Sequence, residues 1–100
     1  MDKFVKQTYE EFTITADFSN NMAVGETITS QTVTVLDAGG DDASIIVVDQ
    51  ASVANDGSTK VSALVRGGGV DLSPYKITFK IVTSVAHKWE LDVQMLVKAV

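Results

Sequence analysis

The clearest pattern in the chain is an alternation of apolar and polar residues over residues 73–97. Side chains on a β-strand point alternately to its two faces, so a period of two predicts a strand with one buried and one solvated face. Two such runs follow each other across a short turn and predict a β-hairpin. Their apolar faces consist of Tyr75, Ile77, Phe79 and Ile81 in the first run, and of Trp89, Leu91, Val93, Met95 and Val97 in the second.

Four further segments read as strands, over residues 12–18, 26–36, 43–49 and 60–66. In the second of these the apolar phase changes between Ile28 and Val33, and because a one-residue slip reverses every side chain, a β-bulge near Ser30 or Gln31 is predicted. The third is short and rich in β-branched residues, which favours a strand over a helix. The run Asn55-Asp56-Gly57-Ser58 is a hairpin-turn signal, and residues 50–55 remain open.

Six or seven short strands separated by frequent turn signals predict an all-β protein, with a sandwich favoured over a small barrel. We expect an immunoglobulin-like antiparallel β-sandwich of about seven strands, formed as a single domain over residues 1–100. Tyr75 stands near the start of the penultimate strand, where immunoglobulin-type domains carry a tyrosine that bonds back to nearby backbone; a plain core tyrosine is the alternative. Residues 1–8 are mostly polar and are expected to form a flexible N-terminal arm, with a short helix as the alternative.

Composition narrows the function classes. The formal net charge of −5, from 13 acidic and 8 basic residues, disfavours binding along a nucleic-acid backbone. The longest apolar run is too short to span a membrane, and the first residues do not resemble a signal peptide. The absence of cysteine excludes disulfides and thiolate metal sites.

The motifs that carry chemistry are weak throughout. The lone His87 lies in the predicted hairpin turn, with neither a nucleophile-elbow motif nor a second histidine at metal-ligand spacing. Residues 37–42 contain three aspartates, but their spacing departs from the calcium-loop pattern. The run Gly67-Gly68-Gly69 lacks the lysine and helix of a phosphate-binding loop and favours a turn or a close backbone approach. We therefore expect a non-enzyme with no catalytic residue, cofactor or metal site.

Apolar side chains on otherwise polar faces are the remaining candidates for function, because they would provide a surface for a protein partner. The alternative is that loops cover them. Trp89 is either a core residue or an exposed interface anchor. The candidate interface residues are Ile46, Val48, Leu64, Val82, Trp89 and Leu96.

Two blocks resemble a known family. Residues 16–32, ADFSNNMAVGETITSQT, resemble the DFS-x-x-L-x-x-G-[DE]-T-I-x-S-x-T opening of small tailed-phage and prophage proteins called fiber–tail adaptor proteins. Residues 69–97 resemble the same family, with a Gly-rich connector, Tyr-x-Ile-Thr, a Thr-Ser turn and a final acid-bearing strand. Relatives often carry Gly-Arg in the last turn, where this chain has Ala86-His87-Lys88, and a tryptophan near Val33.

The resemblance implies an immunoglobulin-like sandwich that serves phage or prophage assembly without catalysis. Its partners would be other phage tail or head proteins, with neither nucleic acid nor membrane involved, and self-association into a homo-oligomer stays open. Such a protein would be a virion component made in the bacterial host cytoplasm. A carbohydrate- or cell-surface-binding sandwich module is the alternative.

Overall fold

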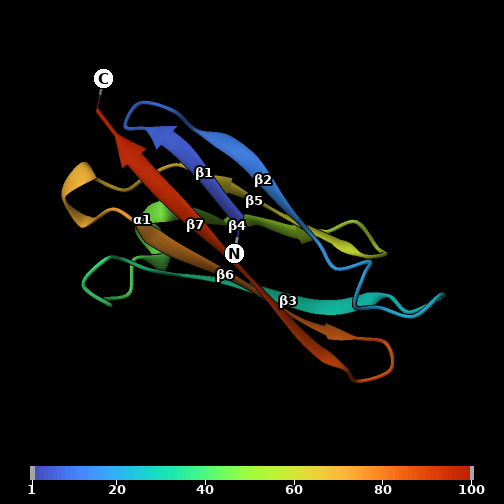
Figure 1. Ribbon diagram of the computed structural model, residues 1–100. Coiled ribbons are helices and arrows are strands. Elements are labelled where there is room, and N and C mark those ends of the chain that lie inside the picture. Colours follow the sequence, from blue (N-terminus) through green and yellow to red (C-terminus); the bar gives the residue numbers. More distant parts are fainter. Residues whose placement is uncertain (1, 100) are drawn as a thin grey trace.

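The computed structural model describes residues 2–99, which form two facing β-sheets (Figure 1). One sheet has the strand order β1-β7-β6-β3 and the other β2-β5-β4. Strands β1 and β7 pair in parallel, and the other pairs are antiparallel. The predicted seven-stranded sandwich is thus confirmed. The elements are β1 (Asp2–Gln7), β2 (Phe12–Asp17), β3 (Ile28–Leu36), α1 (Ser44–Val47), β4 (Val48–Asn55), β5 (Lys60–Val65), the 3-10 turn η1 (Val70–Leu72), β6 (Tyr75–Thr83) and β7 (Lys88–Lys98).

The hairpin of β6 and β7 provides much of the core, as its alternation predicts. All four apolar residues of the first run are buried, and so are Met95 and Val97 of the second. Trp89, Leu91 and Val93 are half-buried and pack against the same core. Opposite them, the second sheet contributes a buried face that contains Ala16, Val61, Ala63 and Val65.

Strand β1 replaces the flexible arm expected over residues 1–8. Phe4 packs edge-on against Phe12 with ring centroids 5.7 Å apart. Lys6 occupies the next inward position and is fully buried, and its Nζ donates a hydrogen bond to the Gln7 carbonyl oxygen at 3.0 Å. A lysine at a core position removes the apolar alternation from this segment, which is why its pattern does not resemble a strand. Met1 lies outside the described residues.

Strand β3 contains the predicted irregularity, between Ile28 and Ser30. The Thr29 hydroxyl donates to the Val82 carbonyl oxygen of β6 at 3.0 Å within this irregular step. The extra residue lets Ile28, Val33 and Val35 all face the core despite their different phases.

The strand expected over residues 43–49 is instead one helical turn, α1, followed by β4. The Val47 amide donates to the Ala43 carbonyl oxygen at 3.0 Å. Ser44 starts the turn through bonds from its amide and hydroxyl to the Asp42 carboxylate, at 2.9 and 2.6 Å. Local side-chain hydrogen bonds of Asp and Ser compete with extended backbone, and here they override the β-branched composition.

Tyr75 makes the predicted bond back to the backbone. Its hydroxyl accepts a hydrogen bond from the Gly69 amide at 2.8 Å and donates one to the Gly69 carbonyl oxygen at 3.1 Å. Gly68 has a φ of +107° and passes close to the Tyr75 ring. These contacts fasten the 67–74 connector to the start of β6.

Candidate functional site

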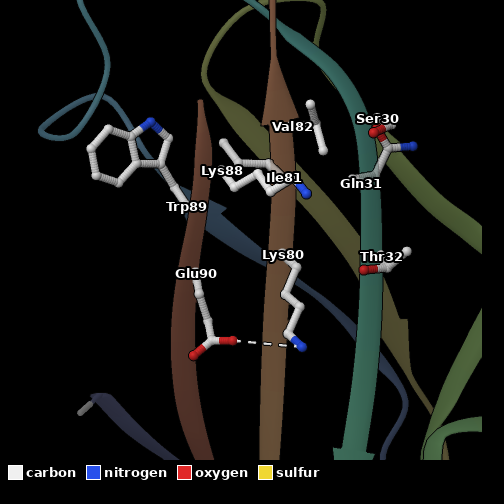
Figure 2. A pocket seen from close by; sticks show the side chains of 9 residues that line it. All are labelled: Ser30, Gln31, Thr32, Lys80, Ile81, Val82, Lys88, Trp89 and Glu90. Atoms are coloured by element: carbon white, nitrogen blue, oxygen red, sulfur yellow. Dashed lines mark ion pairs between the residues drawn. The ribbon is translucent and has the colours of Figure 1, made fainter. Parts of the chain in front are cut away.

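A groove of about 340 Å³ lies on the outer face of the four-stranded sheet, near the β6–β7 turn (Figure 2). Strand register places its residues in rows across β3, β6 and β7. One row pairs Ser30 with Val82 and Val82 with Lys88, and another pairs Thr32 with Lys80 and Lys80 with Glu90. The lining residues are Ser30, Gln31, Thr32, Lys80, Ile81, Val82, Lys88, Trp89 and Glu90.

Val82 is the apolar residue on the outward side of this groove. The alternation of β6 turns Ile81 into the core and leaves Val82 half-buried on the outer face. In register, Val82 has Ser30 of β3 on one side and Lys88 of β7 on the other. Lys80 and Glu90 belong to the next row of the same face. An apolar centre inside a polar rim is the anatomy of a protein-binding surface.

The ion pair at the rim is weak. Lys80 Nζ lies 3.8 Å from Glu90 Oε1, and the two side chains are 59% and 53% exposed. Exposed pairs of this kind contribute roughly 0–1 kcal/mol to stability. A partner can therefore take over either charge at little cost to the fold.

Farther along the same face the polar contacts are tighter. The Thr78 hydroxyl donates to Asp92 Oδ1 at 2.8 Å, and Lys76 Nζ lies 3.8 Å from Asp92 Oδ2. This network occupies the middle of the outer face, so the exposed apolar contact of β6 is local to Val82.

A buried carboxylate supports the groove at its turn end. Glu26 has a side chain that is only 2% exposed, and its Oε1 accepts a hydrogen bond from the Ala23 amide at 2.9 Å. Its Oε2 lies 3.4 Å from His87 Nδ1, so the two form an ion pair whenever the imidazole is protonated. His87 in turn packs edge-on against Trp89, with ring centroids 5.9 Å apart.

The Thr83 hydroxyl is the largest cause of a lowered Glu26 pKa, followed by the Ala23 amide; burial opposes them, and His87 and the Trp89 indole add smaller contributions. Glu26 Oε2 and Trp89 Nε1 are both buried without a hydrogen-bond partner, so Thr83 and Trp89 lie near the carboxylate without forming a hydrogen bond of ordinary geometry with it. Glu26 thus holds the β2–β3 loop against the β6–β7 turn. Sequence reasoning missed this role, although Glu26 is the acid of the G-[DE]-T-I motif.

This carboxylate gives a testable pH dependence. Because the folded pKa lies below the ordinary value of 4.5, the stability that Glu26 contributes is present above pH 4.5 and is lost as pH falls through the folded pKa. We expect Glu26→Gln to lower the melting temperature at pH 7, by about 5 °C, and the gap to wild type to shrink at acidic pH.

Thermal melts between pH 3 and 7 measure this difference, with the exposed Glu11→Gln as control. The pKa values of Asp17, Asp42 and Asp56 are also lowered, so these residues add to the loss of stability in acid. Their contribution is the same in wild type and variant, and it therefore cancels in the difference between the two melting temperatures. A gap that stays constant with pH would contradict the role assigned to Glu26.

The sequence-predicted interface residues do not converge on one site. Val82 lines the groove from the outer face, whereas Trp89 borders it but is in register with inward-facing Ile81 and packs its ring against the core. Leu96 lies beside Val5 near the opposite end of β7. At about 3.3 Å per residue, it is roughly 26 Å along the strand from Lys88 of the groove. Leu64 is half-buried on the outer face of the other sheet, and Ile46 is exposed on α1. Val48 is fully buried, because the helical turn before it shifts it into the core, so it offers no surface.

The acidic loop uses its carboxylates internally. Asp37 Oδ1 accepts hydrogen bonds from the Gly39 and Asp41 amides at 2.9 and 3.0 Å, and Asp42 Oδ1 accepts from the amide and hydroxyl of Ser44. Within residues 2–99, no three histidine, cysteine or acidic side chains are grouped as a metal site would need. No helix in that range is long and apolar enough to cross a membrane.

Comparison with known proteins identifies the relationship. A family model described as podophage GP4 fiber-tail adaptor protein gp77 matches residues 6–98. The match spans β2 to β7 and includes every residue of the groove. It confirms the resemblance inferred from residues 16–32 and 69–97. No match was found among curated proteins.

Proposed function

The chain belongs to the family of podophage GP4 fiber-tail adaptor proteins, and we propose that it is a non-enzymatic module that joins other phage tail proteins by surface contact. Membership implies a structural component of the virion. Synthesis in the bacterial host cytoplasm, and the absence of nucleic acid and membrane from its contacts, are parts of the proposal. The net charge of −5 supports a protein partner over nucleic acid.

The groove around Val82 is the observation that carries the proposal. A partner side chain can cover the exposed part of Val82, while partner charges replace the weak contact between Lys80 and Glu90. Burial of apolar area is worth about 25 cal/mol per Å², and the rim charges would set orientation and specificity. The His87 imidazole faces buried Glu26 rather than a groove hydroxyl, which supports binding over catalysis.

Docking by the sheet face is favoured over addition of a strand to the β3 edge. The Val33 carbonyl oxygen accepts a hydrogen bond from Gln50 Nε2 at 3.1 Å, and the Val35 amide donates to Ser44 Oγ at 2.8 Å. These backbone groups are the ones an added strand would need. The neighbouring β4 and α1 segments therefore already occupy that edge.

Substitution of Val82 tests the groove directly. Val82→Asp places a charge in the docking centre and is expected to reduce incorporation into tails at least about tenfold, because interface centres tolerate unpaired charge poorly. The matched control is Thr34→Asp, an exposed threonine on the outer face of β3 outside the groove. Incorporation is measured as copies of the chain per purified particle, after complementation of phage that lack it.

Circular dichroism and thermal melts of the purified variants separate docking from folding. A folded Val82→Asp protein that incorporates like wild type would rule out the groove. If that variant does not fold, Lys80→Glu combined with Glu90→Lys changes the rim alone and provides the same test.

A further inference from the structure

Exposed apolar side chains gather at the end of the molecule opposite the groove. Among residues 2–99, nine large hydrophobic residues are exposed, and five of them lie on three neighbouring segments: the end of β3, α1 and η1. In Figure 1 these segments lie together at one end, and the β6–β7 turn lies at the other. We call this surface the loop end; it consists of Leu36, Ile45, Ile46, Val70 and Leu72, which are 41%, 76%, 66%, 43% and 50% exposed.

The framework under the loop end is held by hydrogen bonds between the segments. The Ala38 amide donates to the Leu72 carbonyl oxygen at 2.9 Å, which joins the loop after β3 to η1. The Val35 amide donates to Ser44 Oγ at 2.8 Å, which joins β3 to α1. A surface ordered before binding loses little conformational entropy when a partner arrives.

Carboxylates surround the loop end and leave it acidic. Asp37, Asp41 and Asp42 lie between Leu36 and α1, and Asp71 lies between Val70 and Leu72. None of the four forms an ion pair with another residue of the described range. Arg66 is the base that reaches this end: its Nη2 donates to the Ile45 carbonyl oxygen at 3.3 Å, and its Nη1 lies 3.6 Å from Asp49. Lys76 is paired with Asp92 at 3.8 Å, so the four carboxylates still outnumber the bases.

We propose that the loop end is a second docking surface, which binds a protein surface with an apolar centre and a rim of lysine or arginine. Charge complementarity selects this occupant, because an acidic rim attracts a basic one. It also disfavours a second copy placed end to end, since the two acidic rims would repel. The inference rests on the proposed adaptor function and adds the second contact that an adaptor needs.

The geometry suits a bridge between two proteins. The described chain is 44 Å long and about 22 × 21 Å across. Strand β6 begins beside η1 at Tyr75 and reaches the groove at residues 80–82. The two surfaces are therefore separated by most of the length of one strand, and each can be covered without blocking the other.

Particles complemented with three variants test the second surface. Because the groove is assigned to incorporation into the tail, Ile45→Glu combined with Leu72→Glu is expected to reduce attachment of fibers at least about tenfold while the chain is still incorporated. Val82→Asp should reduce incorporation itself. The matched control is Val5→Glu, an equally exposed valine on the outer face of β1, which should leave both steps unchanged.

The outcomes separate the two ideas. Normal behaviour of the folded double variant, with Val82→Asp defective, would overturn the second surface and leave the adaptor function intact. Normal assembly with the folded double variant and also with folded Val82→Asp would overturn both the second surface and the proposed docking by the groove. Loss of incorporation in both folded variants would also overturn the bridge, because the loop end would then contact the same neighbour as the groove.

Zero-length carbodiimide cross-linking of wild-type particles gives an answer that requires no variant to fold. It joins carboxylates to amines only at ion-pair distance. We expect peptides that contain residues 37–42 or 71 to be linked to a lysine of another tail protein. Links confined to lysines of a second copy would contradict the proposed occupant. A rim of arginine, which this reagent does not couple, is tested by the double variant.

Discussion

Replacement of Gly67 by alanine is expected to destabilise the protein by about 3 kcal/mol, the upper end of the usual cost of overpacking. A Cβ atom at this position would overlap the carbonyl oxygen of Ile46 and would lie 3.1 Å from Ile46 Cγ2. The first obstacle is backbone, which cannot rotate away. The Arg66 amide donates to the Val47 carbonyl oxygen at 2.8 Å in the same region, so movement of α1 would also strain that contact.

Gly69 provides a matched control two residues along the same glycine run. A Cβ atom there would meet nothing within 4 Å, and the φ of −102° suits alanine. Gly69→Ala should change stability by less than about 1 kcal/mol. Urea unfolding measures both variants, and a Gly67→Ala protein as stable as wild type would mean that α1 does not pack against this connector.

Phe79→Ala is expected to cost about 3–5 kcal/mol, the range for removal of a buried aromatic ring. The Phe79 ring is 1% exposed, and in register it lies between Val33 of β3 and Leu91 of β7. Its removal would leave a cavity in the middle of the larger sheet, where neighbouring strands restrict collapse.

The next residue of the same strand is the control for Phe79. Lys80 points outward and pairs weakly with Glu90, so Lys80→Ala should alter stability by no more than about 0.5 kcal/mol. Equal losses for the two substitutions in denaturant unfolding would contradict the inward and outward assignment of β6.

Much of the fold could be predicted because the core strands alternate regularly. The β6–β7 hairpin, the 55–58 turn and the bulge in β3 each follow from a local pattern that the structure retains. The position of Tyr75 indicated a bond to nearby backbone as one of two alternatives, and the structure shows that the partner is Gly69. The pattern fails where a polar residue fills a core position, as at Lys6, or where a four-residue helical turn is too short to show a period, as at Ser44–Val47.

The candidate site was less predictable because it depends on contacts between distant segments. Val82 could be identified as apolar on a polar face, but the groove around it requires the register of three strands. Glu26 lies far from His87 in the sequence, and no periodicity links them. Ile46 was identified as an apolar residue of a short β-branched run. The loop end also includes Val70 and Leu72 of η1, a segment that the sequence pattern indicates only as a connector.

The groove at Val82 is the central claim, and lysine labelling tests it most directly. Lys80 and Lys88 line the groove, whereas Lys60 is exposed on β5 of the other sheet. Amine-reactive labelling of the free chain and of the chain in assembled tails, quantified by mass spectrometry, compares these positions. We expect labelling of Lys80 and Lys88 to fall several-fold on assembly while Lys60 stays reactive; unchanged labelling of both groove lysines would contradict the account.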